Sequence, residues 1–213
     1  MDSKETIIAI IANGEVTRSA AAMDAVKSAN VIIAADGGAD NCYLTGITPD
    51  FILGDFDSIT DETREHFPTV KFIHLADQDS TDMEKALSFA RSYSPGRLIV
   101  LSALGRRMDH SSANLMFLAE FNTSVPVEIY DNHGRMTILN PGVHRILGRT
   151  NRIISFFSIR PLVNLTLRGF RYPLHDNSYN PYFVGISNVC ESEECEVSFD
   201  QGILFMYEIT GNG

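Results

Sequence analysis

The sequence predicts an N-terminal α/β domain built on a parallel sheet, followed by a smaller C-terminal all-β sandwich. Up to about residue 131, short β-branched runs alternate with helical patterns, which is typical of β-α units around a buried parallel sheet. After the segment DNHGR, at residues 131–135, no long helical period occurs, and short alternating stretches are separated by Gly, Pro and Asn. We therefore expect an α/β domain over residues 1–132 and a β-sandwich over residues 133–213.

The strands and helices of the first domain can be placed in chain order. Apolar runs predict strands at residues 6–12, 31–35, 51–53, 70–75, 97–103 and 127–131, and helical periods predict helices at residues 19–29, 61–67, 81–93 and 110–121. The third helix opens on Thr81 and Glu84 in the T-x-x-E spacing of a capping box. The first apolar run is too short and wrongly flanked for a signal peptide or a membrane span.

In the second domain, alternating stretches predict strands at residues 151–159, 163–170 and 196–199. The composition around both domains is that of an ordinary globular protein: 44% of the 213 residues are hydrophobic, and the formal net charge is -10. This charge argues against a nucleic-acid or anionic-membrane partner, because both need basic patches. The three cysteines form no C-x-x-C pair, which favours a reducing, cytoplasmic setting over a disulfide framework or a zinc site.

Polar side chains collect just past the carboxyl ends of four predicted strands. They are, in chain order, Asp36 with Gly37 and Gly38, then Asp55 and Asp57, then Asp77 and Asp79, and finally Arg106, Arg107 and Asp109. The carboxyl ends of parallel strands lie along one edge of the sheet, where ligands of doubly wound folds bind. We therefore expect these segments to meet in one crevice.

Several carboxylates in one crevice repel one another, so such a site needs a cation. Mg²⁺ prefers oxygen ligands, and arginine makes bidentate hydrogen bonds to phosphoryl oxygens, so the pattern suggests transfer of a phosphorus group. Gly37 and Gly38 would let backbone N–H groups approach a phosphate, although a Gly-Gly pair after a strand is also a common turn. Neither the P-loop pattern nor G-x-G-x-x-G occurs.

Several polar residues of these segments also suit purely structural positions. Asp61 and Asp82 suit helix starts because of the helix dipole, and one of Arg106 and Arg107 suits a plain surface position. His110 suits a helix start better than a catalytic base, and the pair Asp55 and Asp57 could belong to a solvated loop.

The ordered set ADGGAD, TPDFILGDFDSI, DQDSTDMEKAL, GRRMDHSSANL and GISN resembles the thiamine pyrophosphokinase family over nearly the whole chain. The resemblance implies a homodimer in which each subunit has a Rossmann-like nucleotide-binding domain and a β-sandwich that binds thiamine and forms the dimer. It also implies Mg²⁺-dependent transfer of the pyrophosphoryl group of ATP to thiamine, which yields thiamine diphosphate and AMP.

The resemblance also implies roles for individual residues. Asp55, Asp57, Asp79 and Asp82 would handle Mg²⁺ and the polyphosphate, with Asp36 as the next candidate, and nucleotide contacts would come from Gly37, Gly38, Gln78, Ser80 and Thr81. Arg107 and Asp109 would face the reacting phosphates and thiamine, while Ser187 and Asn188 of the partner subunit would hold the thiamine ring.

Two features depart from the family pattern. Gln78 stands where many bacterial relatives carry lysine, which removes a positive charge beside the polyphosphate. The chain has no tryptophan, so aromatic cover for thiamine would come from residues that also suit the sandwich core or rim, such as Tyr172, Tyr179, Tyr182 or Phe183.

Two further functions fit the residues. One is an aspartyl-phosphate phosphatase that uses the Asp55/Asp57 pair, although here the pair follows the third predicted strand rather than the first. The other is a sensor that binds nucleotide or thiamine without turnover. In the transferase interpretation, Asp109 would orient or deprotonate the thiamine hydroxyl.

Overall fold

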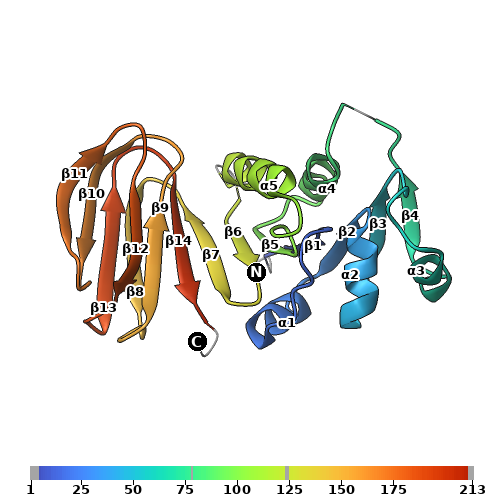
Figure 1. The fold of residues 1–213 in the computed structure, drawn as a ribbon, viewed down its shortest axis with the longest axis horizontal. Coiled ribbons are helices and arrows are strands. Elements are labelled where there is room, and N and C mark those ends of the chain that lie inside the picture. The colour runs from blue at the N-terminus through green and yellow to red at the C-terminus, as the bar shows by residue number, and fades with distance from the viewer. Residues whose placement is uncertain (1–4, 78, 123–124, 211–213) are drawn as a thin grey trace. The chain divides into compact units, whose positions relative to one another are not determined.

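The computed structural model describes residues 5–77, 79–122 and 125–210, and the chain divides into two units, Met1–Asn132 and His133–Gly213. The first unit is a parallel α/β sheet and the second is an antiparallel β-sandwich, so the predicted fold class is confirmed (Figure 1). No helix in the described ranges is long and apolar enough to cross a membrane.

The sheet of the first unit has the strand order β6-β5-β1-β2-β3-β4, and each neighbouring pair is parallel. Its strands are β1 (Ile7–Ile11), β2 (Val31–Ala35), β3 (Phe51–Gly54), β4 (Lys71–His74), β5 (Arg97–Leu101) and β6 (Val127–Tyr130). The order reverses at β1, because the chain proceeds outward from β1 to β4 on one side and from β5 to β6 on the other. Such a switch point opens a crevice beyond the strands' carboxyl ends.

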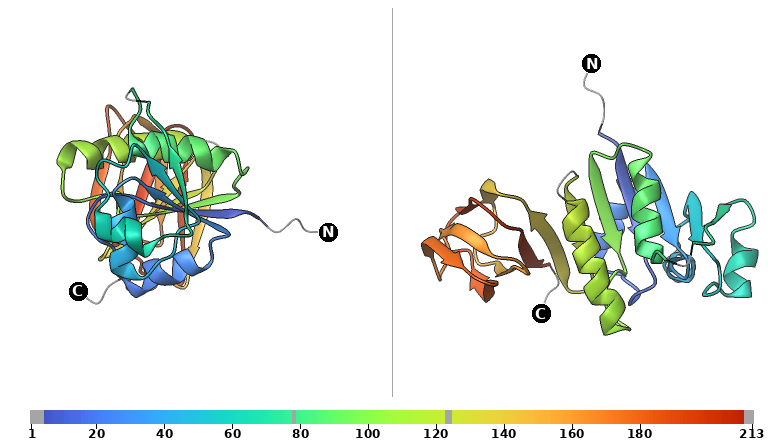
Figure 2. Two further views of the ribbon diagram at one scale, coloured as in Figure 1. Left: turned by 90° about the vertical axis from the view of Figure 1, so that its right-hand side faces the viewer. Right: turned by 90° about the horizontal axis from the view of Figure 1, so that it is seen from above.

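Helices cover both faces of this sheet. They are α1 (Ala20–Lys27), α2 (Gly38–Thr45), α3 (Asp61–His66), α4 (Asp82–Arg91) and α5 (Met108–Phe121). In Figure 1, α4 and α5 lie on one face of the sheet and α1 and α2 on the other, and Figure 2 shows α4 and α5 running side by side over their face. Apolar side chains between these layers form the core, including Ala9, Ile11, Ala34, Ile52, Ile99 and Leu101.

The capping box at the start of α4 is present as predicted. The Thr81 hydroxyl accepts a hydrogen bond from the Glu84 N–H (3.3 Å), and the Glu84 carboxylate accepts one from the Thr81 N–H (2.9 Å). Helix α2 was not predicted, because its sequence GADNCYLT has no strong apolar period. Gly46 ends it in the left-handed conformation, with φ of 70°.

Gly38, the first residue of α2, is a packing position. A Cβ atom at this residue would overlap the carbonyl oxygen of Ile11, so the helix could not sit on β1 as it does. We expect Gly38→Ala to lower the free energy of unfolding by about 3 kcal/mol in urea titrations, near the upper end of overpacking costs. Gly46→Ala is the control: a Cβ there meets nothing within 4 Å, and only the left-handed strain of about 1 kcal/mol should appear. Equal effects of the two substitutions would contradict the packing explanation.

The second unit is a sandwich of two layers, each with four strands of this unit. One layer has the strand order β12-β9-β14-β7, and the other is a four-stranded sheet with the order β11-β10-β13-β8. The strands are β7 (Gly134–Leu139), β8 (Gly142–Leu147), β9 (Ile153–Phe157), β10 (Leu162–Arg168), β11 (Leu174–Tyr179), β12 (Val184–Val189), β13 (Glu194–Phe199) and β14 (Leu204–Ile209). Its core includes Phe156, Leu165, Phe170, Cys195, Val197 and Phe199.

Candidate active site

A cavity of about 710 Å³ lies within the first unit, at the carboxyl ends of its strands. Its walls come from the segments that follow β1, β3, β4 and β5, including Asn13, Asp55, Asp57, Asp77, Arg106, Arg107 and Asp109. Residues far apart in the sequence thus surround one space, as the strand-end pattern predicted. Across the switch point, the Arg106 Nη1 donates to the Asn13 Oδ1 at 2.7 Å.

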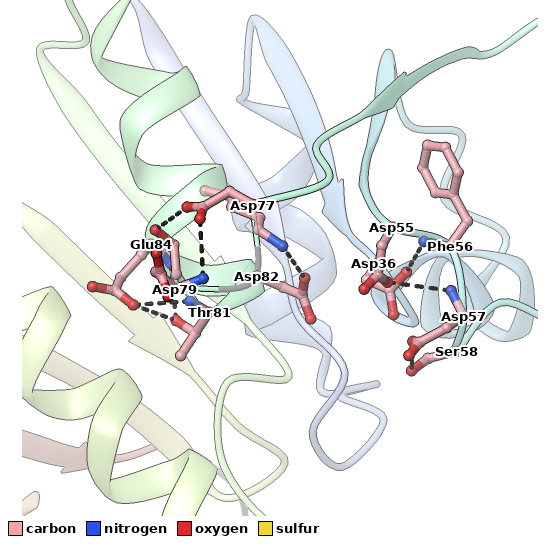
Figure 3. A network of polar contacts seen from close by, with 12 residues as sticks. Asp36, Asp55, Phe56, Asp57, Ser58, Asp77, Asp79, Thr81, Asp82 and Glu84 are labelled. Carbon is pink, nitrogen blue, oxygen red and sulfur yellow. Dashed lines mark hydrogen bonds and ion pairs between the residues drawn. The ribbon is translucent and has the colours of Figure 1, made fainter.

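Three carboxylates meet on one side of this region. Asp36, Asp55 and Asp57 each offer one oxygen, and these oxygens all lie within 4.8 Å of one another. Figure 3 shows them as one group of side chains. Asp36 is buried, Asp55 half-buried and Asp57 exposed, so the group opens from the core toward solvent.

The backbone of the loop after β3 presents the two acids of GDFDS. The Asp36 Oδ1 accepts a hydrogen bond from the Phe56 N–H at 3.0 Å, which ties the loop to the end of β2. Phe56 has a φ of 69°, a left-handed conformation that is strained for a bulky residue, and Arg64 supports it by donating to its carbonyl oxygen at 2.5 Å. This bend lets Asp55 and Asp57 sit beside Asp36 although Phe56 separates them.

Burial and mutual repulsion act on this cluster. Burial is the main cause that raises the pKa of Asp36, and the negative charges of Asp57 and Asp55 raise it further. Burial also raises the pKa of Asp82, the first residue of α4, and Asp36 adds to this effect. A cation bound among these acids would favour their charged forms.

The segment after β4 carries two acids, Asp77 and Asp79. Asp77 lines the cavity, and its carboxylate accepts hydrogen bonds from the Ser80 hydroxyl (2.5 Å) and the Asp79 N–H (3.0 Å). Asp79 is exposed and is not among the residues that line the cavity. The sequence groups Asp79 with Asp55, Asp57 and Asp82, and its role at the site stays a prediction.

Asp82 lies closer to the cluster. In Figure 3 it stands between the group of Asp36, Asp55 and Asp57 and the group of Asp77 and Asp79. It also lines the cavity, so its position at a helix start and a place in the site are compatible.

Arg107 and Asp109 form a bidentate ion pair at the start of α5. The Arg107 Nη2 lies 2.5 Å from the Asp109 Oδ2, and the Nε lies 3.1 Å from the Oδ1. The hydrogen bond from Arg107 lowers the pKa of the exposed Asp109 carboxyl to about 2. Asp109 is therefore ionised at neutral pH and is a weak proton acceptor.

The predicted nucleotide contacts are distributed unevenly. Ser80 and Thr81 line the cavity, whereas Gln78 lies outside the described residues. Gly37 and Gly38 are buried and do not line the cavity. A Cβ at Gly37 would overlap the side-chain amide of Asn13. The space beside Gly37 is therefore filled by the Asn13 side chain.

Ser187 and Asn188 lie on β12 of the second unit. Ser187 is exposed and has a φ of 58°. The Asn188 side chain is buried and bonded to the backbone of Tyr172: its Oδ1 accepts from the Tyr172 N–H at 3.0 Å, and its Nδ2 donates to the Tyr172 carbonyl at 2.9 Å. In this geometry, Asn188 holds the Tyr172 segment in place.

Several polar cavity residues were missed by sequence reasoning, among them Asn13 and Lys85. Asn13 follows β1, and its position just past a strand end was the available signal. Lys85 lies one turn into α4, where the i, i+3 spacing from Asp82 puts both on one side of the helix. Because most lysine side chains are solvent-exposed, the sequence alone does not predict that this lysine is buried.

The comparisons with known proteins agree over both units. The family model "Thiamin pyrophosphokinase, catalytic domain" matches residues 22–129, and "Thiamin pyrophosphokinase, vitamin B1 binding domain" matches residues 143–204. The chain is 31% identical over 189 residues to the thiamine pyrophosphokinase of Bacillus subtilis (strain 168), a match that covers 84% of this chain and 86% of the relative.

Solved structures give the same result. The crystal structure of thiamine pyrophosphokinase from Bacillus subtilis superposes with a TM-score of 0.84 at 28% identity, covering 97% of this chain and 100% of the other. Thiamin pyrophosphokinase from Candida albicans has a TM-score of 0.83 at 18% identity, covering 96% of this chain and 89% of the other, and this likeness shows the fold alone.

Proposed function

Because the chain belongs to the thiamine pyrophosphokinase family and transfers pyrophosphate from ATP to thiamine, we propose that the cavity of the first unit is where this transfer occurs. The observation that carries the proposal is the convergence of Asp36, Asp55 and Asp57 beside that cavity. Polyphosphate transfer needs charge neutralisation and positioning more than covalent chemistry. Clustered acids, which can hold a metal ion, and arginines serve those needs.

The acidic cluster suits Mg²⁺ as the ion. It offers only carboxylate oxygens, the ligands that Mg²⁺ prefers, and leaves coordination positions for water and phosphate oxygens. Asp36, Asp55 and Asp57 would hold the ion, and Asp82, whose pKa is raised by burial and by the charges of these three acids, would join them through its own carboxylate or a water. Bound Mg²⁺ would neutralise charge on the polyphosphate oxygens.

The protein's own residues would position the two substrates. Arg107 has the planar fork that matches two phosphoryl oxygens, and Ser80 and Thr81 offer hydroxyls on the wall of the same cavity. The thiamine hydroxyl would attack the β-phosphorus of ATP, a P–O bond forms to thiamine, the bond to the α-phosphate oxygen breaks, and AMP leaves. The hydroxyl proton passes to solvent or to a nearby base.

One incubation tests the proposed function. Purified protein with ATP, Mg²⁺ and thiamine should form thiamine diphosphate and AMP in equal amounts. Inorganic phosphate without AMP would point to a phosphatase, and binding of both substrates without AMP would point to a sensor. Family membership favours neither alternative. A phosphatase would also require a trappable acyl-phosphate on Asp55, which follows β3.

Asp109→Asn tests whether Asp109 acts as a base. Because Arg107 holds the pKa of Asp109 at about 2, the carboxylate is ionised throughout a pH series of roughly 5 to 9, and its charge is lost only as the pH falls through that pKa. We expect the shape of the kcat profile over that range to be unchanged in the variant, whatever the change in rate. If an ionisation within this range disappeared in Asp109→Asn, Asp109 would be the base.

We also propose that the active enzyme is a homodimer, in which the second unit supplies Ser187 to the thiamine and Asn188 holds the neighbouring backbone. β12 is the terminal strand of its sheet and carries exposed apolar residues: Val184 is 57% and Ile186 is 62% exposed. An exposed apolar edge strand is a surface that needs a partner. Cytoplasmic location is proposed from the three buried free cysteines.

Ile186→Asp tests the dimer. The wild-type protein should sediment as a dimer, and the variant should sediment as a monomer that forms little thiamine diphosphate. The reason is that burying an unpaired carboxylate in the dimer interface has a large unfavourable free energy. The variant's far-UV circular dichroism should match that of the wild type, since Ile186 is exposed on the single chain and its replacement leaves the fold of the subunit intact. Leu147→Asp, at a residue of β8 that is 61% exposed, is the matched control and should remain dimeric and active. A dimeric Ile186→Asp protein would place the interface elsewhere.

A further inference from the structure

Lys85 is a buried cation with little to pair with. Its side chain is 7% exposed, and its Nζ lies 3.8 Å from the Asp82 Oδ1, beyond hydrogen-bond distance. Among the described residues, its ammonium group makes no hydrogen bond. Buried lysines are almost always paired, so three unused N–H donors at this position need an explanation.

The cavity supplies that explanation. Lys85 lines it together with Asp55, Asp57 and Asp82, whereas the arginines of the same wall are already engaged. Arg107 is bidentate with Asp109, and Arg106 donates to Asn13. The ammonium of Lys85, by contrast, makes no hydrogen bond among the described residues, so all three of its donors are available to a ligand.

We propose that the ammonium of Lys85 binds the β- and γ-phosphate oxygens of the nucleotide. This inference rests on the proposed function and adds a substrate-binding residue to it. A lysine acts as a compact point charge with rotatable donors, which suits a triphosphate whose oxygens lie in several directions. Lys85 lies one turn into α4, the helix that Asp82 begins. One rigid helix would therefore present both Asp82 to the metal ion and Lys85 to the phosphates.

The test measures nucleotide affinity rather than turnover. Calorimetric titrations with Mg²⁺ and either α,β-methylene-ATP or AMP are made on the wild type and on Lys85→Met. We expect the affinity for the ATP analogue to fall about 10- to 100-fold, the usual loss for a charged hydrogen bond, while the affinity for AMP, which has no β- or γ-phosphate, changes less than about threefold. Equal losses for both nucleotides, or no loss, would overturn the proposal.

Two controls separate this role from general electrostatics and from folding. Lys71→Met removes the same charge from the exposed strand β4, outside the cavity lining, and should leave both affinities unchanged. Lys85→Gln keeps a polar side chain in the buried position and should show the same selective loss if Lys85→Met is too unstable to titrate. Urea titrations report the stability of each variant.

A double-mutant cycle distinguishes phosphate binding from an effect through Asp82. If Lys85 only neutralises Asp82, the effect of Lys85→Met should vanish in an Asp82→Asn background. If Lys85 contacts the phosphates, the loss of ATP-analogue affinity should persist there, and its disappearance would sink the inference. A wild-type protein that binds no ATP analogue would instead contradict the proposed function itself.

Discussion

Replacing Asp57 with asparagine should reduce kcat at saturating Mg²⁺ and ATP by about 10²–10³, the usual cost of removing one electrostatic contact to a transition state. Asp55→Asn should have an effect of the same size. Each substitution keeps the side-chain shape and removes one of three carboxylate charges that lie within 4.8 Å of one another. Initial rates of AMP formation across a Mg²⁺ series measure the effect, and higher Mg²⁺ should restore part of the loss if metal affinity is what changed.

Asp61→Asn is the matched control for these variants. Asp61 begins α3 four residues after Asp57, and it does not line the cavity. Its rate should stay near that of the wild type. The Asp55→Asn and Asp57→Asn proteins should keep a normal urea midpoint, because removing one negative charge from a repelling cluster does not destabilise the fold. Near-wild-type turnover in both Asp55→Asn and Asp57→Asn would remove the pair from the active site.

Arg107→Gln should lower kcat/KM by about 10², because a preorganised cation that offers two parallel hydrogen bonds is lost from the cavity. The loss should appear mainly in kcat if Arg107 stabilises charge on the transferring group. Initial-rate kinetics with ATP and thiamine varied separately give the two constants.

Arg171→Gln provides the comparison for this effect. Arg171 forms an exposed ion pair with Glu191 in the second unit, with 2.9 Å between the Nε and the Oε1, so it has the same type of partner outside the cavity. Surface pairs of this kind contribute little to stability. A loss in Arg171→Gln as large as that in Arg107→Gln would mean that net charge, and not position, determines the rate.

The first unit was largely predictable because its elements have a local cause. Buried parallel strands are continuous apolar runs, and a capping box marks the start of α4, so the strand positions and that helix agree with the sequence pattern. Helix α2 was missed because its stability comes from packing on β1 through Gly38, which no period records. Several sandwich strands, such as β11 with the sequence LHDNSY, are too exposed to show alternation.

The location of the candidate site followed from topology, whereas its membership did not. The rule that parallel strands end at one edge was enough to group Asp36, Asp55 and Asp57. In the segment after β4, hydrogen bonds from the Ser80 hydroxyl and the Asp79 N–H to Asp77 fix the position of the Asp77 side chain. The spacing of residues in the sequence does not predict these hydrogen bonds. Lys85 was hidden for a similar reason, since burial of a lysine is decided by neighbours from other elements.

Because Asp109 forms a bidentate pair with Arg107 at the start of α5, it competes with a bound phosphoryl group for the Arg107 guanidinium. Both donor positions on one side of the Arg107 guanidinium are already taken by a carboxylate, which is the same shape of ligand that a phosphoryl group would present. A nucleotide that binds this side of Arg107 must replace the Asp109 carboxylate with its own phosphoryl group. Its binding would therefore free Asp109 to bind another group. The Arg107 guanidinium would then pair with Asp109 before the nucleotide binds and with a phosphoryl group afterwards, so its charge would be paired with an anion in both states.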